Sequence, residues 1–129
     1  MARPRDDQPT PAELEVLKVL WEQGPATVRD VMDVLNQGRP RAYTSVMSLL
    51  NVMTDKGLLA RKPLGRAFTY SAKAPREKTL GGLVDDMLGR VFEGSASALV
   101  ARLLDQSSPS AAELAEIRRT IDEYQLQEE

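Results

Sequence analysis

Residues 41–70 join a helical pattern to a hairpin pattern, and this combination restricts the fold more than any other stretch of the chain. Apolar side chains recur there at the spacing of a helix that buries one face, over about residues 43–56. This apolar stripe consists of Val46, Leu49, Leu50 and Met53. Gly57 stands where a helix commonly ends. Residues 58–62 and 67–72 then alternate like strands on either side of Pro63-Leu64-Gly65, which predicts a hairpin.

Two further helical patterns precede this segment. Thr10-Pro11-Ala12-Glu13 is typical of a helix start, with Thr10 as the cap, a proline in the first turn and a glutamate that returns a hydrogen bond. Gly24-Pro25 ends that helix, and Thr27 with Asp30 repeats the capping pattern for the second. Three helices followed by a hairpin is the order of a winged helix-turn-helix domain.

The polar face of the third predicted helix carries short side chains that both donate and accept hydrogen bonds, which suits a DNA groove. Arginines and a lysine flank this helix in sequence, where they would contact phosphates. The candidate DNA-binding residues are Arg39, Arg41, Tyr43, Thr44, Ser45, Ser48, Asn51, Arg61, Lys62 and Arg66. Periodicity alone also allows a solvated face without a ligand, and Tyr43 could either pack its ring or reach a phosphate through its hydroxyl.

The charge distribution also places the predicted DNA-binding surface in the first half of the chain. The whole chain has a formal net charge of −2, but residues 1–75 hold 11 Lys and Arg against 8 Asp and Glu. Residues 76–129 hold 6 against 11. The basic charge therefore lies in the half that carries the winged-helix pattern, and affinity for nucleic acid depends on such a local surface.

The second half is predicted to be helical and to form a dimer. Its apolar stripes are too extensive to remain in water, and 54 residues are few for an independent core. The candidate dimerisation residues are Leu80, Leu83, Val84, Met87, Leu88, Val91, Phe92, Leu99, Ile117 and Ile121. Glycines at positions 81, 82 and 89 weaken a helix, and close approach of another helix would offset that cost.

Composition excludes several classes of function. The chain has no Cys and no His, so a zinc or copper site, a disulfide and a Ser-His-Asp or Cys-His nucleophile are not expected. Asp85 and Asp86 point about 100° apart on a helix and do not form an acid–base pair. The sequence thus predicts no enzyme, no metal and no cofactor. Without a long apolar run or a signal-like N-terminus, it predicts a soluble, cytoplasmic protein with no membrane insertion.

The predicted fold class is mostly α with a small β-hairpin. A flexible arm is expected at residues 1–9, a winged-helix DNA-binding domain at 10–74 and a helical dimerisation domain at 75–129. One rival is a winged-helix module that binds protein and not DNA. Another is a carboxylate hydrolase, which would need a pocket that raises the pKa of an Asp or Glu.

Several stretches of the sequence resemble the BlaI/MecI/CopY family of bacterial transcriptional repressors, over roughly residues 9–124. They include Pro11-Ala-Glu-Leu-Glu-Val-Leu-Lys-Val-Leu-Trp21, Gly24-Pro-Ala-Thr-Val-Arg-Asp30, Tyr43-Thr-Ser-Val-Met-Ser-Leu-Leu-Asn51, Asp55-Lys-Gly-Leu-Leu59, Gly65-Arg-Ala-Phe-Thr-Tyr70 and Phe92-Glu-Gly-Ser95. The resemblance implies a winged-helix homodimer that binds a palindromic, double-stranded operator and represses genes of β-lactam resistance or a related response. It also implies release by a membrane-bound sensor protease that cuts the dimerisation region.

Three departures from the family pattern bear on these implications. The copper-sensing branch uses C-terminal cysteines, which this chain lacks, so copper control is disfavoured. A basic residue is frequent in the family where Val52 stands. The bond that is cut in the penicillinase and methicillin repressors is Asn-Phe and aligns with Arg102 and Leu103, the candidate cleavage position here.

Overall fold

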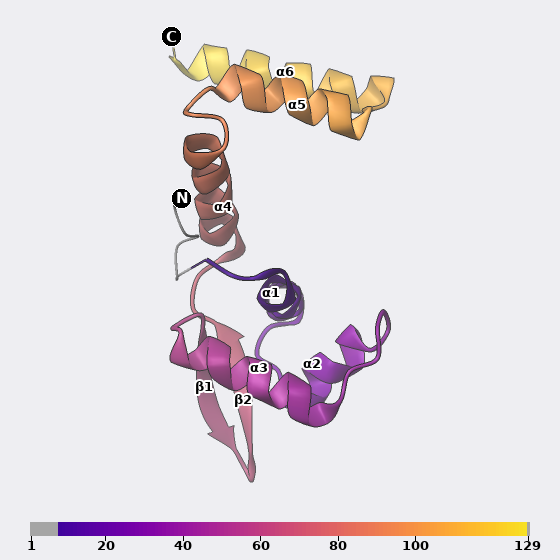
Figure 1. Cartoon of the computed structure of the whole chain (residues 1–129), viewed down its shortest axis with the longest axis vertical. Coiled ribbons are helices and arrows are strands. Elements are labelled where there is room, and N and C mark those ends of the chain that lie inside the picture. Colours follow the sequence, from indigo (N-terminus) through magenta and orange to yellow (C-terminus); the bar gives the residue numbers. More distant parts are fainter. Residues whose placement is uncertain (1–7, 129) are drawn as a thin grey trace. The chain divides into compact units, whose positions relative to one another are not determined.

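The computed structural model describes residues 8–128, so most of the arm predicted at residues 1–9 lies outside the described residues. The chain divides into two compact units, one ending at Asp85 and the other beginning at Asp86. The described helices and strands are α1 (Pro11–Gln23), α2 (Val28–Leu35), α3 (Tyr43–Asp55), β1 (Leu59–Leu64), β2 (Ala67–Ala72), α4 (Arg76–Arg90), α5 (Ala96–Ser107) and α6 (Ala111–Glu128) (Figure 1). The expected class, mostly α with one small hairpin, is confirmed.

The predicted helix caps are present. The Thr10 hydroxyl accepts a hydrogen bond from the Glu13 N–H at 3.2 Å, and the Glu13 carboxylate accepts one from the Thr10 N–H at 2.9 Å. Thr27 and Asp30 make the same reciprocal pair at the start of α2. At the end of α3, Gly57 has φ +84°, a left-handed conformation that glycine adopts without strain. The Ser110 hydroxyl caps α6 by accepting from the Glu113 N–H.

The core of the first unit lies between α1, α2, α3 and the base of the hairpin. Its fully buried large side chains are Val16, Val31, Val46, Leu50, Met53 and Leu59. Three members of the apolar stripe predicted for α3 are buried, and Leu49 is half-buried at the edge of the core. Ala26 and Tyr70 exchange two backbone hydrogen bonds, which join the segment before α2 to strand β2. These contacts fix the hairpin beside α3.

A buried ion pair connects the first helix to the end of the third. The Glu13 side chain is 4% exposed, and both of its oxygens accept from the Lys56 Nζ, at 2.8 and 2.9 Å. Burial would raise the pKa of the Glu13 carboxyl, but the hydrogen bonds from Lys56 and Thr10 and the charge of Lys56 together hold this pKa below its ordinary value. The carboxylate therefore stays ionised in the folded chain.

The hairpin turn differs from the prediction. Pro63 and Leu64 belong to β1, and only Gly65 and Arg66 connect the strands, since Leu64 pairs with Ala67. The prediction that Pro63-Leu64-Gly65 forms the connection was wrong because a proline disrupts only a central strand, and each strand of this two-stranded sheet is an edge. Gly65 has φ +60°, which a tight turn favours.

The second unit has no core of its own. None of the described residues from 86 to 128 is buried. The structure ends α4 at Arg90, so Val91 and Phe92 lie beyond the helix in which the sequence placed them. The left-handed backbone of Glu93 and Gly94 follows this helix end directly. Among residues 8–128, no helix combines the length and apolar character that crossing a membrane requires.

The glycines of α4 have open space where a side chain would stand, although the Gly82 carbonyl accepts a hydrogen bond from Gln8 Nε2 at 3.1 Å. A Cβ atom placed on Gly81, Gly82 or Gly89 would meet nothing within 4 Å. Within residues 8–128 no helix approaches these positions closely, and close approach of another helix there stays a prediction.

Candidate nucleic-acid interface

The exposed face of α3 contains most of the hydrogen-bonding side chains that the sequence placed there. Thr44 and Ser48 lie one helical turn apart and are exposed, and Ser45 is exposed at the side of this face. Met47 and Val52 are also exposed, on either side of Ser48. The apolar stripe in the sequence did not include these two residues, so they were not assigned to either face.

Asn51 is engaged within the protein. Its Oδ1 accepts a hydrogen bond from the buried Tyr70 hydroxyl at 3.1 Å and a longer one from the Arg61 guanidinium at 3.4 Å. The side chain is half-buried between α3 and the hairpin. These contacts hold the hairpin against α3, and a direct contact between Asn51 and DNA stays a prediction.

An open groove of about 390 Å³ lies between the start of α2, the exposed side of α3 and the hairpin. Arg29, Arg61 and Arg66 line it together with Tyr43 and Phe68. The Arg29 guanidinium lies 5.7 Å from the centroid of the Tyr43 ring, and that of Arg61 lies 4.5 Å from the centroid of the Phe68 ring. A guanidinium that rests on an aromatic face is held in place while its N–H groups remain available to an anion.

Sequence reasoning did not assign Arg29 or Phe68 to the interface. Arg29 stands in the first turn of α2, where free helix N–H groups favour an anion, and this was the available signal. No local pattern points to Phe68, because its partner Arg61 is across the hairpin. The Tyr43 ring lies against the Arg29 guanidinium and the residue is 43% exposed, so a contact between its hydroxyl and a phosphate stays a prediction.

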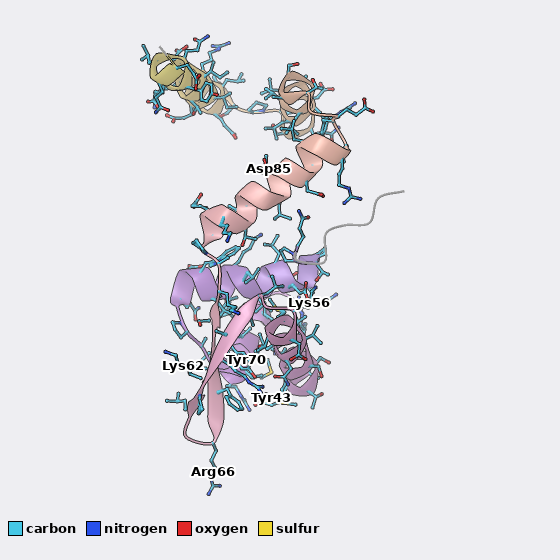
Figure 2. The ribbon with its side chains drawn as sticks, turned by 90° about the vertical axis from the view of Figure 1, so that its left-hand side faces the viewer. Tyr43, Lys56, Lys62, Arg66, Tyr70 and Asp85 are labelled. Carbon is cyan, nitrogen blue, oxygen red and sulfur yellow. The ribbon has the colours of Figure 1, made fainter. Side chains whose placement is uncertain are left out.

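The three cations of the hairpin occupy different places. Side chains alternate between the faces of a strand, so Arg61 shares a face with its register partner Tyr70, whereas Lys62 lies on the opposite face. Arg66 stands at the tip of the hairpin and points away from the helices (Figure 2). Of the three hairpin cations, Arg61 and Arg66 line the groove, Arg66 from the tip of the hairpin, and Lys62 lies on the opposite face.

The start of α3 lacks the cap that α1 and α2 possess. Ala42 occupies the cap position and offers no side-chain hydrogen bond to the free N–H groups. Arg39 is exposed nearby. Arg41 forms an ion pair with Glu15, and its N–H donates to Asn36 Oδ1 at 2.8 Å. A contact between DNA and Arg41 stays a prediction, and it would require the pair with Glu15 to open.

The candidate dimerisation residues remain at least partly exposed in the single chain. Val84, Met87, Val91 and Ile121 are each about half exposed or more, and the other six are half-buried. Arg102 and Leu103 lie inside α5 and are exposed. A protease needs an extended backbone, so cleavage at this bond would require α5 to unwind locally.

Comparison with known proteins gives a consistent family assignment. The family model described as penicillinase repressor matches residues 9–123. The transcriptional regulator BlaI of Mycobacterium tuberculosis is 30% identical over 88% of this chain and 82% of its own length. The penicillinase repressor of Bacillus licheniformis is 24% identical over 88% of each chain. A crystal structure of a transcriptional regulator from Thermotoga maritima covers 90% of this chain and 73% of its own, with 16% identity and a TM-score of 0.53, and shares the fold.

Proposed function

The chain belongs to the penicillinase repressor family, whose members are transcriptional repressors and not enzymes, and we propose that it represses transcription by binding double-stranded operator DNA. The observation that carries this proposal is the groove between α2, α3 and the hairpin, which Arg29, Arg61 and Arg66 line. Thr44 and Ser48 are exposed on the same helix, α3. The helix face fits a major groove, and the surrounding guanidinium groups fit the adjacent phosphates.

We further propose that the repressor is a cytoplasmic homodimer that reads a palindromic operator, one half-site per protomer. The α5 and α6 helices expose apolar side chains and bury none, so each protomer needs a second copy to cover them. The DNA-binding domain is placed at residues 10–74 and the dimerisation domain at 75–129. The regulated genes are those of β-lactam resistance or a related response, and a membrane-bound sensor protease releases the repressor by cutting between Arg102 and Leu103.

The DNA-binding proposal is tested by fluorescence anisotropy on duplexes enriched from a randomised library. The purified protein should bind an enriched duplex more tightly than a random one, and the logarithm of its affinity should fall linearly with the logarithm of salt concentration. A chain that enriches no sequence and shows no salt-dependent affinity for any duplex would instead be a protein-binding winged helix.

Arg66→Ala is expected to weaken enriched and random duplexes by a similar factor. An arginine at the hairpin tip is placed to contact phosphate, so its loss should reduce the salt slope by about one per contact, or about two per dimer. Titrations over a range of salt concentrations measure this slope. The matched control is Lys18→Ala, which removes an exposed cation of α1 that does not line the groove. A changed base preference with an unchanged slope would contradict the phosphate assignment.

Ser48→Ala is expected to show the opposite behaviour. Ser48 lies near the middle of the exposed face of α3, so the variant should lose about 1–3 kcal/mol per half-site on the enriched duplex and little on random DNA. The free energy of unfolding, followed by thermal denaturation, should change by no more than about 0.5 kcal/mol, as is usual for an exposed position. Equal losses on the two duplexes would make this face a backbone contact.

A further inference from the structure

Two apolar side chains stand on the face of α3 that otherwise carries hydroxyl groups. Val52 is 50% exposed and Met47 is 37% exposed, although the core of the same unit lies on the other side of the helix. Val52 follows Thr44 and Ser48 along one face at four-residue spacing, and Met47 lies on the other side of Ser48. A β-branched residue is also a weak helix former, so helix propensity does not explain a valine at an exposed position.

The chemistry of the major groove offers one apolar target on the edges of the bases. Thymine presents a 5-methyl group there, whereas the other groups that distinguish the base pairs are hydrogen-bond donors and acceptors. A serine side chain such as that of Ser48 satisfies the donors and acceptors but has no methyl group to place against that of thymine. We propose that Met47 and Val52 recognise thymines in each half-site through contact with their 5-methyl groups. This inference rests on the proposed function and adds which base of the operator α3 recognises.

The surroundings of these residues argue against a protein partner on the same face. Met47 lines the groove that holds Arg29, Arg61 and Arg66, so a second copy of this surface would bring like charges together. Ser48 stands between Met47 and Val52, so the two do not form the continuous apolar patch that a protein interface presents. An anionic polymer that carries methyl groups matches both the arginines of the groove and the exposed apolar side chains of Met47 and Val52.

The test removes single methyl groups from DNA. A duplex enriched from a randomised library is synthesised with deoxyuridine in place of thymine at one symmetric pair of positions at a time. Deoxyuridine keeps every hydrogen bond of thymine and lacks only the 5-methyl group. Wild-type protein should lose about fourfold in affinity per contacted methyl, the factor expected for exposing one buried methyl-sized group to water. Equal affinity for all of these duplexes would overturn the proposal.

Variants assign the effect to residues. Val52→Ser removes both methyl groups of the side chain, and Met47→Gln keeps the length of the side chain while it replaces the apolar end with a polar one. At the thymine that it contacts, each variant should lose the distinction between thymine and deoxyuridine, because the two changes remove the same contact. The matched control Ser48→Ala should retain it. Thermal unfolding of each variant separates misfolding from loss of contact.

The outcomes also separate this inference from the proposed function. If the protein binds an enriched duplex but neither Val52→Ser nor Met47→Gln changes the response to deoxyuridine, the thymine assignment is wrong and the repressor proposal stands. If no duplex is enriched at all, the repressor proposal fails and the inference fails with it.

Discussion

Lys56→Met is expected to lower the free energy of unfolding by about 2–3 kcal/mol at pH 7. The substitution keeps the aliphatic length of the side chain and leaves the buried Glu13 carboxylate without its cation. Removing one partner of a fully buried pair costs about 3–5 kcal/mol, and the partial exposure of Lys56 reduces this expectation. The ion pair therefore contributes to the stability of the DNA-binding unit although it contacts no DNA surface proposed above.

The stabilisation by the Glu13–Lys56 pair is expected to depend on pH. In the wild type the folded pKa of Glu13 lies below its unfolded value of about 4.3, so this contribution is complete above that pH and is lost as pH falls through the folded pKa. In Lys56→Met, burial without the lysine cation raises the pKa of the Glu13 carboxyl in the folded state. Protonation at low pH then removes the cost of burying an unpaired charge. Urea unfolding should therefore show a smaller difference between the two proteins at pH 4 than at pH 7.

A matched control comes from the second ion pair of α1. Glu15 pairs with Arg41 but is half exposed, so Glu15→Gln should cost no more than about 1 kcal/mol. If Lys56→Met cost the same as Glu15→Gln, or showed the same cost at pH 4 and pH 7, the Glu13 pair would not have the role assigned to it.

Local features of the winged-helix unit were predictable from the sequence because their causes are local. The caps at Thr10 and Thr27, the glycine after α3 and the buried side of α3 each depend on residues within one or two helical turns. The order of three helices and a hairpin followed from these signals. The position of the hairpin turn did not, because it depends on which residues pair across the strands.

The parts of the site that were missed depend on distant segments. The pairing of Arg29 with Tyr43 joins α2 to α3, and the hydrogen bond from Tyr70 turns Asn51 toward the hairpin. The exposed Met47 and Val52 show another limit, since a pattern that assigns apolar residues to the core gives no place to an apolar residue on a binding face. Neither kind of information is present in the spacing of residues along one helix.

Removal of residues 75–129 is expected to reduce affinity for a palindromic operator by about 10²–10⁴-fold. The remaining unit keeps its own buried core, so it should fold and bind a half-site as the full chain does. Two linked protomers gain effective concentration when they occupy both half-sites, and two unlinked ones do not. The loss should therefore appear on the full operator and not on a single half-site.

Sedimentation and binding together test this expectation. The full chain should sediment as a dimer at micromolar concentration and the shortened chain as a monomer. Ile121→Glu in the full chain serves as a second variant, because it places a charge on a half-exposed apolar position of α6 without deleting any residue. It should also weaken dimerisation and leave half-site affinity unchanged. A shortened chain that remains dimeric, or that loses half-site and full-operator affinity equally, would show that α5 and α6 do not join the two protomers.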